Sequence, residues 1–242
     1  MYAIKATNLK KRYKDVTAVD GLNLQIASGK LFALLGVNGA GKTTLVRMLS
    51  TITKATDGDA LVCGYSISRE PMNVKRSIGV CPQETAVALN LSVRENLLLT
   101  CGIYGLKKEV GERRIAELSD ILGLSSVLER RAGRLSGGWQ RRLSIAMALV
   151  SEPSVLFLDE PTIGLDVIAR SELWELIRAL KGRMTIVLTT HYMEEAEALA
   201  DEIGIMKDGR LLFTGTLEDI KNRTGEKRLD SAFVKIIKEE RV

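Results

Sequence analysis

The chain has 242 residues, of which 45% are hydrophobic and 27% are charged, with 21 glycines and 4 prolines. This composition is typical of a soluble globular protein and excludes collagen-like, fibrous and disordered classes. No uncharged apolar run approaches the roughly 18 to 20 residues that a membrane-spanning helix needs. The net charge is +5, but its basic residues are scattered in short groups, which favours solvated faces over a nucleic-acid-binding stripe: Lys10-Lys11-Arg12, Arg113-Arg114, Arg130-Arg131 and Arg141-Arg142.

The N-terminus and the cysteines bear on where the protein resides. Met1 is followed by an alternating polar and apolar stretch that lacks the basic segment and apolar core of a signal peptide, so we expect a cytosolic protein. Cys63, Cys81 and Cys101 are odd in number and lack a CxxC spacing. Such cysteines suggest reduced, buried thiols rather than a disulfide framework or a zinc site.

The first elements along the chain are strands. Residues 3–26 alternate with a period of two, which predicts antiparallel strands joined by turns. Residues 31–35 instead form a continuous apolar run of strand length, as do residues 155–158 and 185–188. Continuous runs are typical of strands that are buried on both faces, so these three predict a parallel sheet covered by helices.

Helical patterns separate these strands. Ser92 and Glu95 fit a capping box at the start of a helix, and apolar residues keep helical spacing from there to Gly123. We expect further helices at 139–150, 173–180 and 193–200, and a terminal helix after Asn222. In the helix at 193–200, the residues expected to face outward are Glu194, Glu195 and Glu197.

The order of these elements defines the predicted fold class. No strand-like run occurs between residues 86 and 150, so this stretch is predicted to form a helical lobe inserted into an α/β core. The fold class is therefore α/β, with a mostly parallel sheet, an N-terminal antiparallel part and an inserted helical lobe. The single domain 1–242 divides into a core of 1–85 and 152–220, a lobe of 86–151 and a C-terminal tail of 221–242.

A glycine-rich loop follows the first buried strand and precedes a helix beginning at Thr44. Its residues satisfy the phosphate-loop pattern GxxxxGK[ST]: Gly36, Val37, Asn38, Gly39, Ala40, Gly41, Lys42 and Thr43. The glycines permit the turn, so that backbone N–H groups and the helix N-terminus face phosphate oxygens. Lys42 would neutralise the β and γ phosphates, and Thr43 would coordinate Mg²⁺. The strand and helix around the loop argue against a mere glycine-rich turn and predict a P-loop NTPase core.

Two carboxylates end the second buried strand. Asp159 and Glu160 stand at the carboxyl edge of the sheet, where open α/β sheets bind ligands. Asp159 is suited to hold Mg²⁺ through water, and Glu160 to act as the general base on the attacking water. Taken alone, the pair could also be an acidic helix cap before Pro161.

A second glycine motif carries a family resemblance. Leu135-Ser136-Gly137-Gly138-Trp139-Gln140 ends 19 residues before Asp159, and its Ser-Gly-Gly turn opens a helix whose N-terminus can bind an anion. With the phosphate loop, this motif resembles those of the ATP-binding subunits of ABC transporters. The resemblance implies a head-to-tail dimer in which Ser136, Gly137 and Gly138 of one copy close on the ATP held by the lysine loop of the other.

Further residues match the same family along the chain. The resemblance implies that Gln83 senses Mg²⁺ and the attacking water, that Asp166 in Gly164-Leu165-Asp166 lies in a loop touching the partner copy, and that Tyr13 stacks on adenine. It also implies that His191, which ends the third buried strand, contacts the γ-phosphate and orients Glu160. Alone, Gln83 could be a surface amide, Tyr13 a strand-edge residue and His191 a structural histidine.

The resemblance implies an ATPase that uses ATP and Mg²⁺ and drives a transporter. Its partners would be a second ATPase subunit, in a homodimer or heterodimer, and integral membrane permease subunits, with no nucleic acid. The chain would then be peripheral on the cytoplasmic face of the membrane. Residues 192–216 and 229–233 look most like subunits of drug, lipid or polysaccharide exporters. The alternatives are a soluble ABC-type ATPase that is not coupled to transport, a DNA-repair relative, and a module that binds nucleotide without hydrolysing it.

Overall fold

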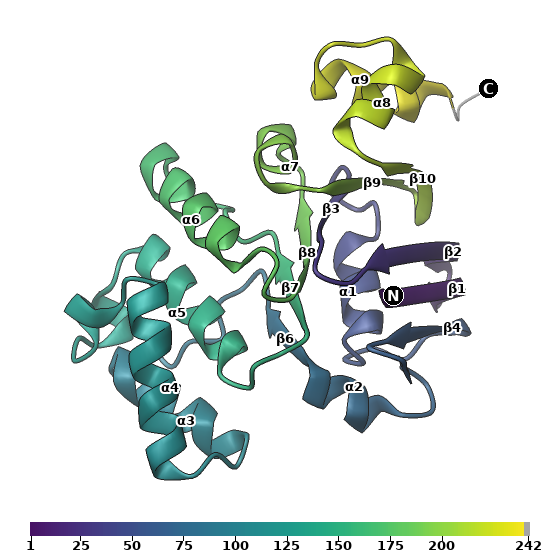
Figure 1. Ribbon diagram of the computed structural model, residues 1–242. Coiled ribbons are helices and arrows are strands. Elements are labelled where there is room, and N and C mark those ends of the chain that lie inside the picture. The colour runs from purple at the N-terminus through teal and green to yellow at the C-terminus, as the bar shows by residue number, and fades with distance from the viewer. Residues whose placement is uncertain (240–242) are drawn as a thin grey trace.

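A computed structural model describes residues 1–239, and these residues form two sheets with helices around them (Figure 1). The smaller sheet is antiparallel in the order β2-β1-β4-β5. Its strands are β1 (Tyr2–Tyr13), β2 (Val16–Ala27), β4 (Asp57–Val62) and β5 (Tyr65–Ser66). β1 and β2 are the antiparallel strands predicted at 3–26, and the alternation arises because one face of the pair packs into the core.

The larger sheet has the order β10-β9-β3-β8-β7-β6, in which only β10 is antiparallel to its neighbour. The strands are β3 (Leu31–Leu35), β6 (Ile78–Cys81), β7 (Val155–Asp159), β8 (Thr185–Thr190), β9 (Glu202–Lys207) and β10 (Arg210–Gly215). β3, β7 and β8 confirm the three predicted buried strands, and every residue in them is buried. The predicted fold class is therefore confirmed.

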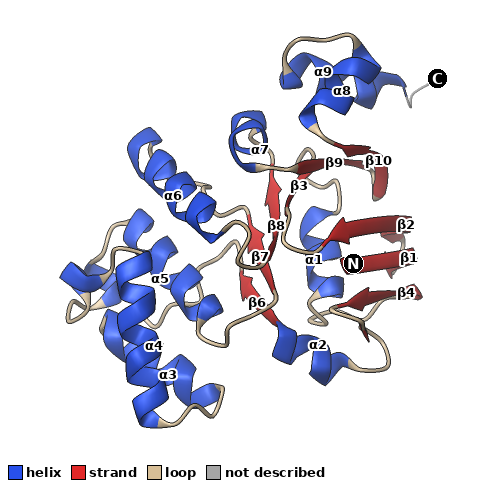
Figure 2. Cartoon of the chain, viewed as in Figure 1, coloured by secondary structure: helices blue, strands red, loops and turns tan. Residues whose placement is uncertain are grey.

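The helices divide into groups that are separate in space (Figures 1 and 2). Those of the described residues are α1 (Lys42–Leu49), α2 (Pro71–Ser77), α3 (Val93–Ile103), α4 (Lys108–Ile121), α5 (Gly137–Leu149), α6 (Val167–Leu180), α7 (Met193–Leu199), α8 (Leu217–Thr224) and α9 (Leu229–Glu239), with short 3-10 turns at Ser125–Val127 and Ala132–Arg134. Helices α3, α4 and α5 gather on one side of the larger sheet, away from the antiparallel sheet, and α8 and α9 lie beyond β9 and β10.

Three apolar clusters hold these layers together. Buried residues of β1, β2, β3 and α1 form the cluster between the two sheets, and those of α7, α9, β3 and β9 form the cluster at the C-terminal end. The third cluster joins Leu97, Leu118 and Leu143 of the helices α3, α4 and α5 to Leu156 and Ile186 of the sheet. The helical segment is thus packed on the sheet through α5.

Local predictions of helix ends are mostly close. The capping box at Ser92 and Glu95 is present at the start of α3. Helices α1 and α5 each begin two residues earlier than predicted, because both start at the glycine-rich turns themselves. The terminal helix predicted after Asn222 is α9, and α8 before it was not predicted; residues 240–242 lie outside the described residues.

Two predictions of exposure are wrong. Glu195 does not face outward but is 0% exposed, because α7 packs against α6 and the Trp174 indole N–H donates to its Oε1 at 3.0 Å. Arg141 is not on a solvated face but is 5% exposed, because α5 turns this side chain under the segment that follows β6. Of the cysteines, all of which are free, Cys81 and Cys101 are buried and Cys63 is half-buried.

Candidate functional site

A pocket of about 540 Å³ opens where the carboxyl ends of β3, β7 and β8 meet. This is the edge at which parallel α/β sheets bind ligands. The predicted site residues that line it are Asn38, Gly39, Ala40, Gly41, Lys42, Thr43, Thr44, Gln83 and Glu160. The pocket therefore brings together residues that are up to 122 positions apart (160 minus 38).

Residues 38–41 of the glycine-rich loop form one wall of the pocket, whereas Gly36 and Val37 do not line it. Gly41 has a φ of 103°, and a Cβ there would lie 2.3 Å from the carbonyl oxygen of Ala18, so only glycine fits. Gly41 is also the N-cap of α1 and supplies no side-chain hydrogen bond. The first amides of α1 are consequently available to an anion in the pocket.

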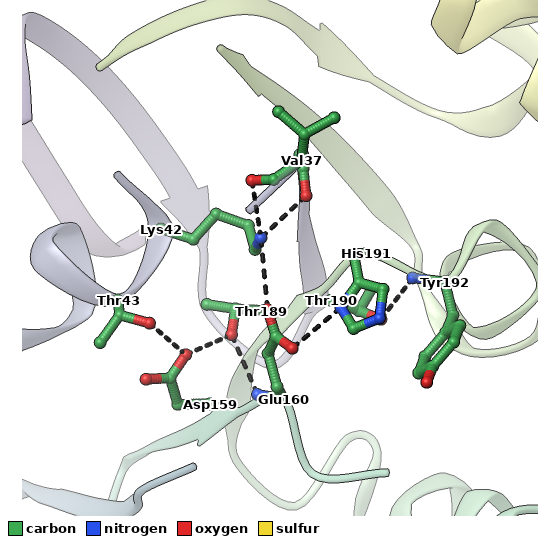
Figure 3. A network of polar contacts seen from close by, with 10 residues as sticks. Val37, Lys42, Thr43, Asp159, Glu160, Thr189, Thr190, His191 and Tyr192 are labelled. Carbon is green, nitrogen blue, oxygen red and sulfur yellow. Dashed lines mark hydrogen bonds and ion pairs between the residues drawn. The ribbon is translucent and has the colours of Figure 1, made fainter. Parts of the chain in front are cut away.

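Lys42 is the cation of this site, and its side chain is only 4% exposed. Its Nζ donates to the carbonyl oxygens of Gly36 at 2.8 Å and Val37 at 3.3 Å, and lies 3.3 Å from Oε1 of Glu160 (Figure 3). A buried charge requires such partners. The ammonium is therefore already held at the mouth of the loop, where phosphates would bind.

The two acidic residues at the end of β7, Asp159 in the strand and Glu160 directly after it, are fixed by β8. The Thr189 hydroxyl donates to Oδ1 of Asp159 at 2.5 Å and accepts the backbone N–H of Glu160 at 3.0 Å. Glu160 itself has a φ of 47°, which is uncommon for a residue with a side chain and indicates local strain. The hydrogen bonds from β8 hold this conformation, which turns the Glu160 side chain toward Lys42.

His191 completes the network from the end of β8. Its Nδ1 lies 2.9 Å from Oε2 of Glu160, so the Glu160 carboxylate stands between the imidazole and the Lys42 ammonium (Figure 3). This places a base at the pocket wall with both of its oxygens oriented. The geometry suits a carboxylate that takes a proton from a water molecule in the pocket.

The residues predicted to hold Mg²⁺ offer hard oxygen donors, which this cation prefers. Thr43 Oγ1 lies 3.1 Å from Oδ1 of Asp159, and the Gln83 residue lines the same pocket. In residues 1–239 no group of three or more His, Cys, Asp or Glu side chains forms a separate metal site. The oxygen pair of Thr43 and Asp159 therefore fits a magnesium ion that arrives with a phosphate ligand.

Several predicted residues do not line the pocket. Tyr13 is an exposed residue at the end of β1, with the Lys11 ammonium 4.8 Å from its ring centroid, while Val16 to Ala18 line the pocket in its vicinity. Asp166 is the N-cap of α6 and accepts N–H groups of Ile168 and Ala169, both at 2.9 Å.

The Ser-Gly-Gly turn lies outside the pocket as well. Ser136 is the N-cap of α5, but its side chain makes no capping hydrogen bond. The turn adjoins α6 and the loop before it, because a Cβ on Gly138 would lie 3.3 Å from Cβ of Ala169 in α6, and one on Gly137 would lie 3.7 Å from Cδ2 of Leu165 in the loop. Within one chain, the residues 136–138 and 166 thus form a second group away from the lysine loop.

Sequence reasoning missed some residues of the site. Thr189 carries no predicted role, although it ends a buried strand as Asp159 does, and that place is the signal that could have identified it. Asp208 and Gly209 line the pocket from the turn between β9 and β10. An Asp-Gly pair predicts a turn, but only the folded sheet brings that turn to the site.

The fold and this pocket define a nucleotide-binding protein with a phosphate loop. The sequence model of the ABC transporter family matches residues 19–163, and the chain belongs to this family. It is an ATP-binding and ATP-hydrolysing subunit, and ATPase subunits of this family dimerise and work with transporter partners. No helix of the described residues has the length and apolar character required to cross a membrane.

Named relatives and solved structures agree with this family. The daunorubicin resistance ATP-binding protein DrrA2 of Streptomyces coeruleorubidus is 41% identical over 230 residues, which are 95% of this chain and 71% of that protein. The linearmycin resistance ATP-binding protein LnrL of Bacillus subtilis (strain 168) is 38% identical over 223 residues, 92% of this chain and 72% of that protein. An ATP-binding subunit of an ABC transporter superposes with a TM-score of 0.86 at 28% identity, covering 97% of this chain and 99% of that one. A dimeric ATP-binding cassette bound to ADP and phosphate has a TM-score of 0.79 at 26% identity, covering 88% and 98%.

Proposed function

We propose that two copies of this chain, or this chain and a similar subunit, bind ATP between the lysine loop of one and the Ser-Gly-Gly turn of the other. In a twofold dimer each contact occurs twice, so two ATP molecules would be enclosed. The uncapped N-terminus of α5 supports this role for Ser136, Gly137 and Gly138, because its free backbone N–H groups can donate hydrogen bonds to a phosphate. Asp166, in the adjoining loop, would face the partner copy.

The reaction is the attack of water on the γ-phosphorus of ATP. Glu160 accepts a proton from the water as the new P–O bond forms and the bond to the β-phosphate oxygen breaks, which leaves ADP and phosphate. His191 orients the Glu160 carboxylate, and Lys42 neutralises the phosphates. Mg²⁺, held by Thr43 and Asp159 and sensed by Gln83, would supply positive charge to the phosphate oxygens. The observation that carries this proposal is the Glu160 carboxylate held between Lys42 and His191.

Export is the transport function that the relatives favour. Both named relatives are resistance proteins against drugs, which supports a role in powering drug export through separate permease subunits. In this proposal residues 86–151 form a lobe of their own, the core is 1–85 and 152–220, Tyr13 stacks on the adenine, and the chain is held at the cytoplasmic face of the membrane by its permease. Purification from membranes tests this, since a bound polytopic partner supports transport, whereas its absence favours an ATPase that is not coupled to transport.

Glu160→Gln tests the catalytic proposal. The variant keeps the size of the side chain and removes the base, so ATP hydrolysis is expected to fall by about 100-fold or more while ATP still binds. Because the nucleotide is no longer consumed, a stable ATP-bound dimer should accumulate. Light scattering measures the dimer, and phosphate release measures hydrolysis. Glu175→Gln, an exposed change in α6, is the control and should behave as the wild type does. Phosphate release by Glu160→Gln at the wild-type rate would overturn the assignment.

A further inference from the structure

Arg141 is a buried cation in α5 that the reaction described above does not use. Its guanidinium donates to the carbonyl oxygen of Pro82 at 2.7 Å through Nη1 and to that of Gln83 at 2.7 Å through Nη2. Nη1 also lies 3.7 Å from Sγ of Cys81. Two parallel bonds from one planar group fix both the position and the orientation of the backbone that they contact.

The backbone that Arg141 holds leads directly into the ATP pocket. Gln83 lines that pocket together with Lys42 and Glu160. Among the described residues, no other hydrogen bond reaches residues 82–87, and Pro82 has no N–H to donate. The next polar contact along the chain is at Ala88, whose backbone bonds to the Asn96 side chain. Arg141 is therefore the sole polar anchor of the segment that presents Gln83.

Stability alone does not explain this arrangement. Arg141 is 5% exposed and, in the described part of the chain, forms no ion pair with a carboxylate. Removing a charge from water without an opposite charge is unfavourable, and apolar side chains of similar size are often as stable in such places. The adjacent Arg142 shows the usual alternative, since it pairs with Glu172 at the surface.

Arg141 and the Ser-Gly-Gly turn belong to the same rigid helix. Arg141 follows Ser136 by five residues, which is about one and a half helical turns. The far end of α5 is docked on β6, because a Cβ on Gly79 would lie 2.2 Å from the carbonyl oxygen of Ala148. A displacement of the Ser136 end of α5 would consequently be passed to the carbonyl oxygens of Pro82 and Gln83.

We propose that Arg141 is a positioning residue that couples the two ATP sites of the dimer. This proposal rests on the proposed function, in which Gln83 serves the ATP bound by its own copy and Ser136 serves the ATP bound by the partner. The Arg141 fork joins these two elements in one chain. Binding of ATP against the Ser136 turn then sets the position of Gln83 at the other site, so the two sites close together.

Arg141→Met and Arg141→Lys test the coupling. The single variants report kcat, and the same changes combined with Glu160→Gln report ATP-dependent dimer formation. Methionine fills similar space without donors, and lysine can reach one carbonyl oxygen but not both. We expect Arg141→Met to raise the ATP concentration for half-maximal dimer formation by about tenfold. The Hill coefficient of dimer formation should fall from about 2 to about 1. ATP affinity of the monomer should stay within about twofold, kcat should fall by about tenfold, and Arg141→Lys should be intermediate.

Arg114→Met provides the matched control. Arg114 lies in α4, has a side chain that is 12% exposed, and donates to the carbonyl oxygen of Leu149 at the other end of α5 at 2.8 Å. The Arg114→Met substitution removes an arginine-to-carbonyl bond to the same helix, but away from the pocket. The thermal stability of this variant can therefore fall while its kcat and Hill coefficient stay at wild-type values.

The outcomes separate this proposal from the function on which it rests. If Glu160→Gln alone forms no ATP-dependent dimer, the proposed function fails. If Glu160→Gln dimerises and the Arg141→Met combination dimerises at the same ATP concentration with the same Hill coefficient, the coupling role is overturned. It is equally overturned if Arg114→Met and Arg141→Met lower kcat and the melting temperature in the same proportion, because Arg141 would then only support the fold.

Discussion

The lysine-loop side of the site and the Ser-Gly-Gly turn differ in how far one chain completes them. On the lysine-loop side, Lys42, Asp159, Glu160 and His191 all bond to groups of the same chain. At the turn, the Ser136 side chain makes no capping bond and lies away from the pocket. One chain thus preorganises the lysine-loop side, whereas the turn, which we propose to be the other half of a shared nucleotide site, is left without partners by a single copy.

Two serines at helix N-termini show the same difference at the level of one residue. Ser92 Oγ accepts the N–H of Glu95 at 3.1 Å, and Glu95 Oε2 accepts the N–H of Ser92 at 2.7 Å. At the same position after Ser136 stands Trp139, whose side chain cannot accept that bond. The second bond of a capping box is therefore impossible at Ser136, and since its own side chain makes no capping bond either, this helix end is open to a ligand.

Ser136→Arg changes the Ser-Gly-Gly turn and should have the largest effect on dimer formation and phosphate release. The long cation would fill the space that a partner's ATP needs, yet it lies outside the lysine-loop pocket. We expect ATP affinity of the monomer within about twofold of wild type, no ATP-dependent dimer, and phosphate release reduced by about 100-fold or more. Light scattering and equilibrium binding of a fluorescent ATP analogue measure the two effects. Dimer formation at the wild-type ATP concentration would contradict the shared site.

Ser92→Ala and Ser136→Ala compare the two helix N-termini directly, with smaller effects that are expected in the free energy of unfolding. Loss of the capping box should lower the free energy of unfolding by about 1 kcal/mol for Ser92→Ala, whereas Ser136→Ala removes no capping bond and should change it by less than about 0.5 kcal/mol. Urea denaturation measures both. Activity should follow the opposite order, since in the proposed dimer only Ser136 faces the partner's nucleotide. Equal losses of stability would show that Ser136 caps its helix in solution.

The parts of this structure that the sequence predicts are those with a local physical signature. The runs 31–35, 155–158 and 185–188 identify β3, β7 and β8 because strands buried on both faces are nearly continuous in apolar residues. β6 escapes prediction because it has only four residues, and β9 and β10 escape it because both begin with charged residues. The phosphate loop is recognisable because its backbone geometry requires glycine at fixed positions, which the sequence shows directly.

What the sequence does not predict is which polar side chains become buried. Arg141 resembles its neighbour Arg142 in every local respect, and Glu195 resembles Glu194, yet one member of each pair is enclosed. The difference depends on which helix face meets β6 or α6, and those contacts join residues that are distant along the chain. Helical periodicity predicts a face from apolar residues alone, so a charged residue on the packed face is assigned to solvent.

Glu195→Gln examines the helix α7 that follows His191, where Oε2 of Glu195 and Oγ1 of Thr162 are buried without a hydrogen-bond partner in the described residues. Burial raises the pKa of the Glu195 carboxyl above its ordinary value of 4.5, and the hydrogen bond from the Trp174 indole and the charge of Arg170 offset this only in part. Between 4.5 and that raised pKa the folded chain keeps a proton that the unfolded chain has lost. The contribution of Glu195 to the free energy of unfolding is therefore greatest below this window and declines as pH rises through it.

Glutamine cannot titrate and still offers an oxygen to the Trp174 N–H, so Glu195→Gln should lose this decline. Relative to wild type, the melting temperature of the variant should rise as pH increases from about 5 to about 8, by a few degrees at most. Glu194→Gln, an exposed change on the same helix, should give a difference that is constant with pH. If the difference in melting temperature is constant with pH for Glu195→Gln as well, the buried carboxyl titrates as it does in the unfolded chain. The polar contacts of Glu195 would then compensate fully for its burial.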